Sequence, residues 1–217
     1  MLSDNELTEN GFTAPRGKAP GRVLLLACGA LAREILALKE MNGWGHLELT
    51  CLPAKLHLFP DQIPDAVRAK VTEARANGYD TIKVVYADCG TGGLLDTVCE
   101  ELEVERIEGP HCYSFFEGNQ AFADHPDEIT AFYLTDFLVK QFDAFVWKPM
   151  GLDRHPELRD MIFGNYEKLI YLSQINNPAL VEQAREQADR LGLTFEHRHT
   201  GYGDLPEFLA NSAKDEG

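Results

Sequence analysis

Three segments of the chain share one order: an apolar run of strand length, a short turn, and then apolar residues at helical spacing. They begin at residues 22, 81 and 168, and in the first two the apolar run leads into Cys-Gly. After each turn, small and branched apolar residues recur every three or four positions, which is typical of one buried helix face. Strands alternating with helices predict an α/β fold with a mostly parallel sheet, or a pseudo-repeat of small βαβ layers.

Each predicted helix leads into another strand-like stretch, at 46–52, 104–109 and 193–199. The helix of the third unit is expected to begin at Asn177-Pro178 and to end at Gly192, because Pro suits a first helical turn and Gly suits the residue after the last one. Right-handed crossovers bring the carboxyl ends of parallel strands to one edge of a sheet. We therefore expect any site built from these strand ends at that edge.

Outside the repeat, the chain divides into a leader, one domain and an insertion. Residues 1–20 are polar, with several glycines and prolines, which predicts a disordered leader. Residues 21–210 are expected to form a single α/β domain. Within it, residues 113–165 lack the strand–helix order and predict a helical insertion, with an amphipathic helix over 132–142 and another over 156–166. This insertion would cover the site or bind a partner.

The charge of the chain argues against two classes of partner. Its 35 acidic and 20 basic side chains give a formal net charge of −15, so neither nucleic acid nor an anionic membrane is an expected partner. No apolar run reaches the roughly 18–20 residues of a membrane-spanning helix, and the first residues do not resemble a secretory signal. We therefore expect a cytoplasmic protein, in which its five cysteines are reduced.

Three of the cysteines stand where predicted strands end. Cys28 and Cys89 are each followed by Gly and then by a helix, whose first N–H groups and partial positive charge favour a thiolate. Cys112 follows another strand-like stretch. Three thiols at one sheet edge suit zinc or an iron–sulfur cluster, and either is left open here. A fourth ligand could be His57, His111 or a water molecule.

The other two cysteines are expected to fill the core. Cys99 lies on the apolar face of a predicted helix and Cys51 lies inside a predicted strand, and unpaired cysteine is among the most often buried residue types. The interval from Cys28 to Cys51 nevertheless equals that from Cys89 to Cys112, which suggests an internal duplication. In the third unit, Ser173 stands where the cysteine would fall.

Glycines follow Cys89 closely. The run from Cys89 to Gly93 offers backbone amides that could hold a phosphate or carboxylate. Gly90, Gly92 and Gly93 are therefore candidate cofactor-binding residues, although a tight turn explains them equally well. The run has neither the order of a dinucleotide fingerprint nor the lysine of a phosphate loop.

Several polar side chains have two interpretations. His57, in a loop with two prolines, is a ligand, a proton shuttle or a packed side chain. His197 and His199 alternate on one strand face, which fits exposed polar alternation better than a metal pair. Asp88 and Glu117 are candidate acid–base groups, but solvated carboxylates are the simpler interpretation.

Short motifs, taken in their order along the chain, resemble the domain-of-unknown-function family numbered 1638. The resemblance runs from about residue 22 to 175. The motifs are Ala27-Cys28-Gly29, Leu52-Pro53-Ala54 with Leu56-His57, Tyr86 with Cys89-Gly90, His111-Cys112-Tyr113 before Glu117-Gly118, and Tyr133-Leu134-Thr135.

The resemblance implies a metabolic setting and a set of site residues. Members of that family are often encoded beside corrinoid proteins and methyltransferases, which implies one-carbon metabolism with a corrinoid or tetrahydrofolate. Carried over by position, it implies the metal ligands Cys28, His57, Cys89 and Cys112. The leading hypothesis is a metal-binding enzyme or accessory enzyme of methyl transfer, with a small-molecule substrate and a corrinoid protein or methyltransferase as partner.

Two other hypotheses stay open. In one, the chain is a non-catalytic protein that binds a corrinoid, a folate or a methyltransferase through its aromatic stretch at 113–147. In the other, Cys28 or Cys89 is the nucleophile of a metal-free thiol enzyme.

Overall fold

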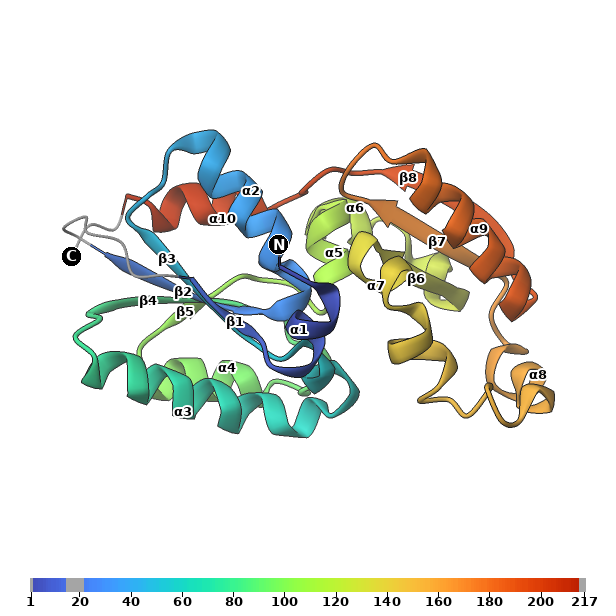
Figure 1. The fold of residues 1–217 in the computed structure, drawn as a ribbon, viewed down its shortest axis with the longest axis horizontal. Helices are drawn as coiled ribbons and strands as arrows, with labels where there is room; N and C mark the ends of the chain where they lie inside the picture. The colour runs from blue at the N-terminus through green and yellow to red at the C-terminus, as the bar shows by residue number, and fades with distance from the viewer. Residues whose placement is uncertain (1, 15–21, 215–217) are drawn as a thin grey trace. The chain divides into compact units, whose positions relative to one another are not determined.

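The computed structural model describes residues 2–14 and 22–214. They form two compact units, where the sequence predicts one domain over 21–210. Unit 1 comprises Met1–Phe115 with Asp204–Gly217, and unit 2 comprises Phe116–Gly203. Each has its own sheet flanked by helices (Figure 1). The predicted α/β class with mostly parallel strands is confirmed.

The sheet of unit 1 has the strand order β1-β3-β2-β4-β5. Neighbouring strands in this sheet pair in parallel, except that β1 pairs with β3 in the antiparallel direction. The buried run Leu24–Leu26 lies in the central strand β2, which explains why it is apolar without alternation. The strands are β1 (Phe12–Thr13), β2 (Val23–Cys28), β3 (Leu47–Leu52), β4 (Thr81–Val85) and β5 (Glu105–Arg106).

Helices cover both faces of this sheet, with α3 and α4 on one face and α2 and α10 on the other (Figure 1). Val67 and Val71 of α3 pack with Leu24 and Leu26 of β2 in one hydrophobic cluster, and each fully buried side chain of this kind contributes about 1.5–3 kcal/mol. The α-helices are α1 (Asp4–Glu9), α2 (Ala32–Asn42), α3 (Ile63–Ala76), α4 (Leu94–Glu101), α5 (Cys112–Glu117) and α10 (Leu205–Ser212). Short 3₁₀ turns η1 (Gly29–Leu31), η2 (Ala54–Leu58) and η3 (Pro60–Gln62) join them.

Unit 2 contains a three-stranded parallel sheet in the order β6-β7-β8. Its strands are β6 (Ala131–Thr135), β7 (Lys168–Ser173) and β8 (Thr194–His199). Its α-helices are α6 (Asn119–Ala123), α7 (Asp136–Lys140), α8 (Arg159–Phe163) and α9 (Pro178–Leu191), and its other turns are η4 (Pro126–Thr130), η5 (Asp143–Trp147) and η6 (Pro156–Leu158).

The predicted helix over 132–142 is wrong in its first half. Residues 131–135 are the strand β6, which pairs in parallel with β7, and only the residues from Asp136 onward are helical. Tyr133 and Leu134 are both buried, a pattern that suits a strand covered on both faces. The segment 113–165 is therefore more than a helical insertion, since it supplies the first strand of the second sheet. The strand expected at 104–109 is shorter, with two residues in β5.

Much of the predicted leader is ordered. Ser3 and Glu6 form a capping box that starts α1, and Leu7 of that helix is fully buried. Gly11 has a φ of +72°, and a side chain there would meet the Cys51 carbonyl oxygen at 2.1 Å, so the approach of β1 to β3 requires glycine. The part of the leader at 15–20 lies outside the described residues. Among the residues that are described, no helix has both the length and the apolar character to cross a bilayer.

Candidate thiol site at the strand ends

The three predicted cysteines lie in unit 1, each after a strand. Cys28 is the last residue of β2, Cys89 lies in the loop after β4, and Cys112 is the first residue of α5. None of the three forms a disulfide, and all three are half-buried. Cys28 ends its strand as predicted, whereas Cys89 comes four residues after β4 and Cys112 comes six residues after β5, at the start of a helix.

The backbone around Cys89 brings Cys112 close to it. The amide of Asp88 donates to the Gly109 carbonyl at 3.0 Å, and the amide of Cys89 donates to the Pro110 carbonyl at 2.9 Å. These two bonds extend the pairing of β4 and β5 beyond the strands themselves. Cys89 also has a φ of +50°, a left-handed conformation that is uncommon for residues with a side chain and that clusters at functional sites.

Cys89 and Cys112 form a sulfur pair beside an imidazole. The hydrogen bond that Cys89 receives from the Cys112 thiol holds the pKa of Cys89 well below its ordinary value, against the effect of burial. His57, in the turn η2 after β3, hydrogen-bonds Cys89 and lowers its pKa further. The pKa of Cys112 is raised correspondingly, first by the same hydrogen bond and then by burial. Cys89 is therefore the more acidic thiol of this pair.

Cys28 is the protonated neighbour of this pair. Burial raises the pKa of Cys28 to about 12, and the charge on Cys89 adds to that effect, while the Ala30 amide opposes it. The Tyr86 hydroxyl is buried, interacts with the Cys28 thiol, and has no hydrogen bond of ordinary geometry. Tyr86 follows β4 directly and is not among the predicted site residues. The signal for it is a tyrosine at the end of an otherwise apolar strand.

His111 directly precedes Cys112 in the chain. Its ring stacks on Tyr113 with centroids 4.7 Å apart. Burial lowers the pKa of His111, so the imidazole is neutral near neutral pH, although the charge on Cys89 opposes that shift. A neutral imidazole is the form that binds a metal ion.

The glycine run after Cys89 already holds an anion, the carboxylate of Asp88. That carboxylate accepts hydrogen bonds from the Thr91 hydroxyl at 2.5 Å and from the amides of Gly92 and Gly93 at 3.1 and 2.8 Å. Burial works to raise the pKa of Asp88, but these bonds outweigh it and the pKa is lowered. Asp88 thus clamps the turn. Binding of an external anion by Gly90, Gly92 and Gly93 stays a prediction.

Cys51 and Cys99 are buried, as a packing role predicts. Cys51 lies inside β3, and Cys99 packs in the hydrophobic cluster between α3, α4 and the sheet. The equal spacing of the two cysteine pairs therefore does not correspond to equal positions, because Cys51 is within a strand whereas Cys112 begins a helix.

The donors of the thiol site suit a soft metal in kind. In the ranges 2–14 and 22–214, no group of three or more His, Cys, Asp or Glu side chains is already arranged to hold a metal ion. The sulfur pair, the adjacent imidazole and the nearby Cys28 are nevertheless the ligand types that zinc and iron–sulfur clusters take. These side chains would have to turn toward one another to share one ion.

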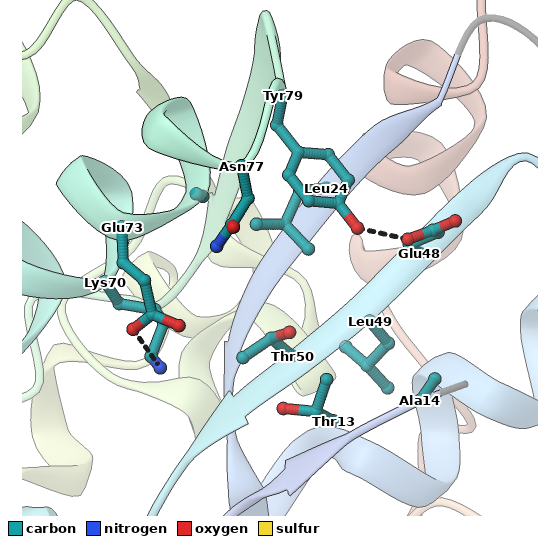
Figure 2. A pocket seen from close by; sticks show the side chains of 11 residues that line it. Thr13, Ala14, Leu24, Glu48, Leu49, Thr50, Lys70, Glu73, Asn77 and Tyr79 are labelled. Carbon is teal, nitrogen blue, oxygen red and sulfur yellow. Dashed lines mark hydrogen bonds and ion pairs between the residues drawn. The ribbon is translucent and has the colours of Figure 1, made fainter. Parts of the chain in front are cut away.

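One cavity of unit 1 lies at the opposite end of the strands from the thiol site. A hollow of about 80 Å³ between β3 and α3 is lined by Thr13, Thr50 and Tyr79, with Tyr79 bonded to Glu48 at one end and Lys70 paired with Glu73 (Figure 2). Glu48 is at the amino-terminal end of β3, whereas the thiols follow carboxyl ends. No predicted site residue lines this hollow.

Two other sequence candidates are Glu117, in unit 2, and the aromatic stretch at 113–147, most of which is in unit 2. Glu117 is buried and pairs with Arg198 at 2.5 Å, so it is part of an ion cluster and not a solvated carboxylate. Most rings of the aromatic stretch at 113–147 are in the core; those of Phe115, Phe116, Phe137, Phe142 and Phe145 are buried.

The fold and the thiol cluster together define an α/β protein with a cysteine site after the strands of a mostly parallel sheet. The profile of one protein family, described as protein of unknown function DUF1638, matches residues 51–209, and the chain belongs to that family. His57, Cys89 and Cys112 lie inside the matched range, and Cys28 precedes it. No curated protein and no solved structure matches the chain.

Proposed function

We propose that this protein binds a soft metal, zinc or an iron–sulfur cluster, and acts as an enzyme or accessory enzyme in corrinoid- or tetrahydrofolate-linked methyl transfer. The observation that carries the metal part is the backbone bonding of Asp88 and Cys89 to the carbonyls of Gly109 and Pro110, which brings Cys112 close to Cys89. The opposite pKa shifts of the two thiols and the effect of His57 on Cys89 agree with it. The setting in one-carbon metabolism is part of the proposal and rests on what the family resemblance implies, since the family model itself is described only as a protein of unknown function.

The residues of the site have distinct roles in this proposal. Cys89 is the more acidic of the two ligand thiols, and Cys112 loses its proton on binding, since metals take the deprotonated form of cysteine. Cys28 and His57 complete the ligand set. A bound zinc would supply a Lewis acid, whereas a cluster would transfer electrons. Gly90, Gly92 and Gly93 are proposed to contact an anionic group of a cofactor or substrate.

Metal content and colour of anaerobically purified protein test the proposal. We expect about one zinc per chain in colourless protein, or a brown protein containing iron and sulfide. Cys89→Ser and Cys112→Ser should lose most of that metal. Cys99→Ala, which removes a buried thiol outside the cluster, is the matched control and should retain it. Metal-free wild-type protein, or equal loading of all variants, would contradict the proposal.

A second candidate function is metal-free thiol chemistry at Cys89. The left-handed backbone of Cys89 and the imidazole of His57 at its sulfur favour it. This alternative predicts that metal-free protein is alkylated by iodoacetamide at Cys89 first, and that His57→Gln slows that reaction. The two candidate functions can be distinguished by alkylation in the presence of zinc. Added zinc should protect Cys89 from alkylation only if the metal proposal holds.

The proposed partner is a corrinoid protein or methyltransferase, and the proposed location is the cytoplasm, where five free cysteines stay reduced. Co-purification of a tagged chain with a corrinoid protein from the same cells tests the partner. The alternative of a non-catalytic aromatic docking surface has less support, because most rings in 113–147 are buried.

A further inference from the structure

A second polar cluster occupies the carboxyl ends of the strands in unit 2. Ser173 is the last residue of the central strand β7 and is 1% exposed. His197 and His199 lie on the neighbouring strand β8, both exposed, with His199 directly opposite Ser173 in the parallel register. Carboxyl ends of parallel strands are where α/β proteins place their ligands. None of these residues belongs to the thiol site.

Both imidazoles hydrogen-bond the same hydroxyl. The Ser173 Oγ lies 2.9 Å from His197 Nε2 and 3.0 Å from His199 Nδ1. A hydroxyl has one proton, so it can donate to only one of these nitrogens and must accept from the other. One imidazole is therefore placed to take the proton of Ser173, and the other to donate an N–H to the oxygen that remains. Interpreting His197 and His199 as solvent-facing polar residues does not explain why both rings bond the same buried hydroxyl.

Buried neighbours fix the orientation of His197. The ring of Tyr171 stacks on it at a centroid distance of 5.3 Å, and the Tyr171 hydroxyl donates to Asp136 Oδ1 at 2.6 Å. Asp136, which is 1% exposed, also accepts from the amides of Gln174 and Ile175 at 3.1 Å each. The loop that follows Ser173 is thus held by the same carboxylate that anchors Tyr171. Stacking on this anchored Tyr171 ring restricts the plane of the His197 imidazole.

The charge state of His197 agrees with a role as base. Burial lowers the pKa of His197, and the neighbouring His199 and Arg185 lower it further, while Asp136 opposes them. The imidazole is therefore unprotonated near neutral pH, which is the form that accepts a proton.

We propose that Ser173 is a nucleophile for acyl transfer, with His197 as its base and His199 as the N–H donor to its oxygen. The Ser173 Oγ forms a bond to the carbonyl carbon of an ester while its proton passes to His197 Nε2. The carbon–oxygen bond to the alcohol then breaks, and the alcohol leaves with that proton. Water, deprotonated by His197, releases the carboxylic acid and restores Ser173.

The burial of Ser173 restricts the substrate class. Its hydroxyl lies beneath two exposed imidazoles and is itself almost inaccessible, so small acyl groups such as acetyl are expected as substrates, and bulky or branched ones are not. This activity is separate from the metal proposal, since no cysteine takes part in it.

Labelling of the full-length chain with methanesulfonyl fluoride, a serine-directed reagent small enough for this site, followed by peptide mass spectrometry, tests the proposal. We expect the methanesulfonyl group on Ser173, none at that position in Ser173→Ala, and about 100-fold slower labelling in His197→Gln. His155→Gln is the matched control, because His155 is an exposed imidazole that faces Glu157 and no hydroxyl. Labelling elsewhere, no labelling, or an unchanged rate in His197→Gln would each overturn the proposal.

A second variant, Ser173→Cys, tests the proposal independently in case Ser173→Ala does not fold. In Ser173→Cys the thiol would take the place of the hydroxyl between the imidazoles, and iodoacetamide should alkylate position 173 at least about tenfold faster than in the same variant combined with His197→Gln. Wild-type protein should also hydrolyse p-nitrophenyl acetate, Ser173→Ala should lose that hydrolysis, and His155→Gln should retain it. Equal alkylation of the two variants would show that His197 does not activate position 173.

Discussion

At the scale of single residues, Cys89 combines a strained backbone with a stabilised thiolate. Its φ of +50° is one that glycine adopts freely, and two backbone bonds of residues 88 and 89 to 109 and 110 hold it there. Retaining cysteine at such a position sacrifices stability for the placement of one sulfur. The same sulfur receives the Cys112 hydrogen bond and the His57 contact, so strain and electrostatics point to one atom.

Glycine and alanine substitutions at Cys89 measure that strain. Both remove the thiol, but only alanine keeps a Cβ, so we expect Cys89→Gly to be more stable than Cys89→Ala by about 1 kcal/mol in urea unfolding. The order should reverse at Cys99, which lies inside the helix α4, where glycine is about 1 kcal/mol less favourable than alanine. Equal stability of the two Cys89 variants would mean that the left-handed backbone is not retained in solution.

At the scale of elements, local sequence signals predict the ends of helices well. The pairing of strands that lie far apart in the sequence could not be predicted from them. The helix α9 begins after Asn177, whose side chain caps it, and ends at Gly192 with a φ of +75°, as predicted. The sequence of β6 alone predicts a helix, because its strand conformation depends on pairing with β7, more than thirty residues away. The positions of Cys28 and Cys89 near strand ends could be predicted from the apolar runs before them. The proximity of Cys112 to Cys89 depends on hydrogen bonds to the Gly109 and Pro110 carbonyls, which no local sequence pattern reveals.

The turn after β4 depends on Asp88. Replacing Asp88 with alanine removes the acceptor of the Thr91, Gly92 and Gly93 hydrogen bonds, and we expect a loss of about 1–3 kcal/mol in the free energy of unfolding. Asn at this position should recover part of the loss because its side-chain oxygen accepts the same amides. Proteolytic cleavage within 88–93 should become faster in Asp88→Ala. Unchanged stability and cleavage would show that the glycine run holds its turn without the carboxylate.

An ion cluster joins η4, β7 and β8 in unit 2 and makes their stability pH-dependent. Hydrogen bonds from Arg198, and then from Lys168 and Tyr133, lower the pKa of Glu128 from 4.5 to about 2. A lowered folded-state pKa contributes stability that is fully present above the unfolded value of 4.5 and is lost as the pH falls toward 2.

Glu128→Gln tests this dependence. Glu128 is buried whereas Arg198 is partly exposed, so we expect the variant to lose roughly 2 kcal/mol near neutral pH, less than the ~3–5 kcal/mol of a fully buried pair. Urea unfolding across pH should show the difference from wild type shrinking between pH 4.5 and 2. Glu207→Gln, on α10 of unit 1 and outside this cluster, is the control. A difference that does not change with pH would exclude Glu128 as the titrating group.

At the scale of the whole molecule, the proposed metal site and the proposed serine site lie in different compact units. Metal binding should therefore stabilise one unit specifically. A ligand at 100 times its dissociation constant adds about 2.7 kcal/mol to the state that binds it. Because the amides of residues 88 and 89 bond to 109 and 110, we expect that stabilisation to appear in the segments 86–93 and 109–113.

Hydrogen exchange measured by mass spectrometry with and without zinc can locate this effect. We expect slower exchange in 86–93 and 109–113 on zinc addition, reversal by a chelator, and no change in the peptides of β6, β7 and β8. Cys89→Ser should abolish the protection, whereas Ser173→Ala should leave it intact. Protection at β8 that depends on His197 and His199 would instead locate the metal at the serine cluster, because two imidazoles converge there, and would refute both assignments together.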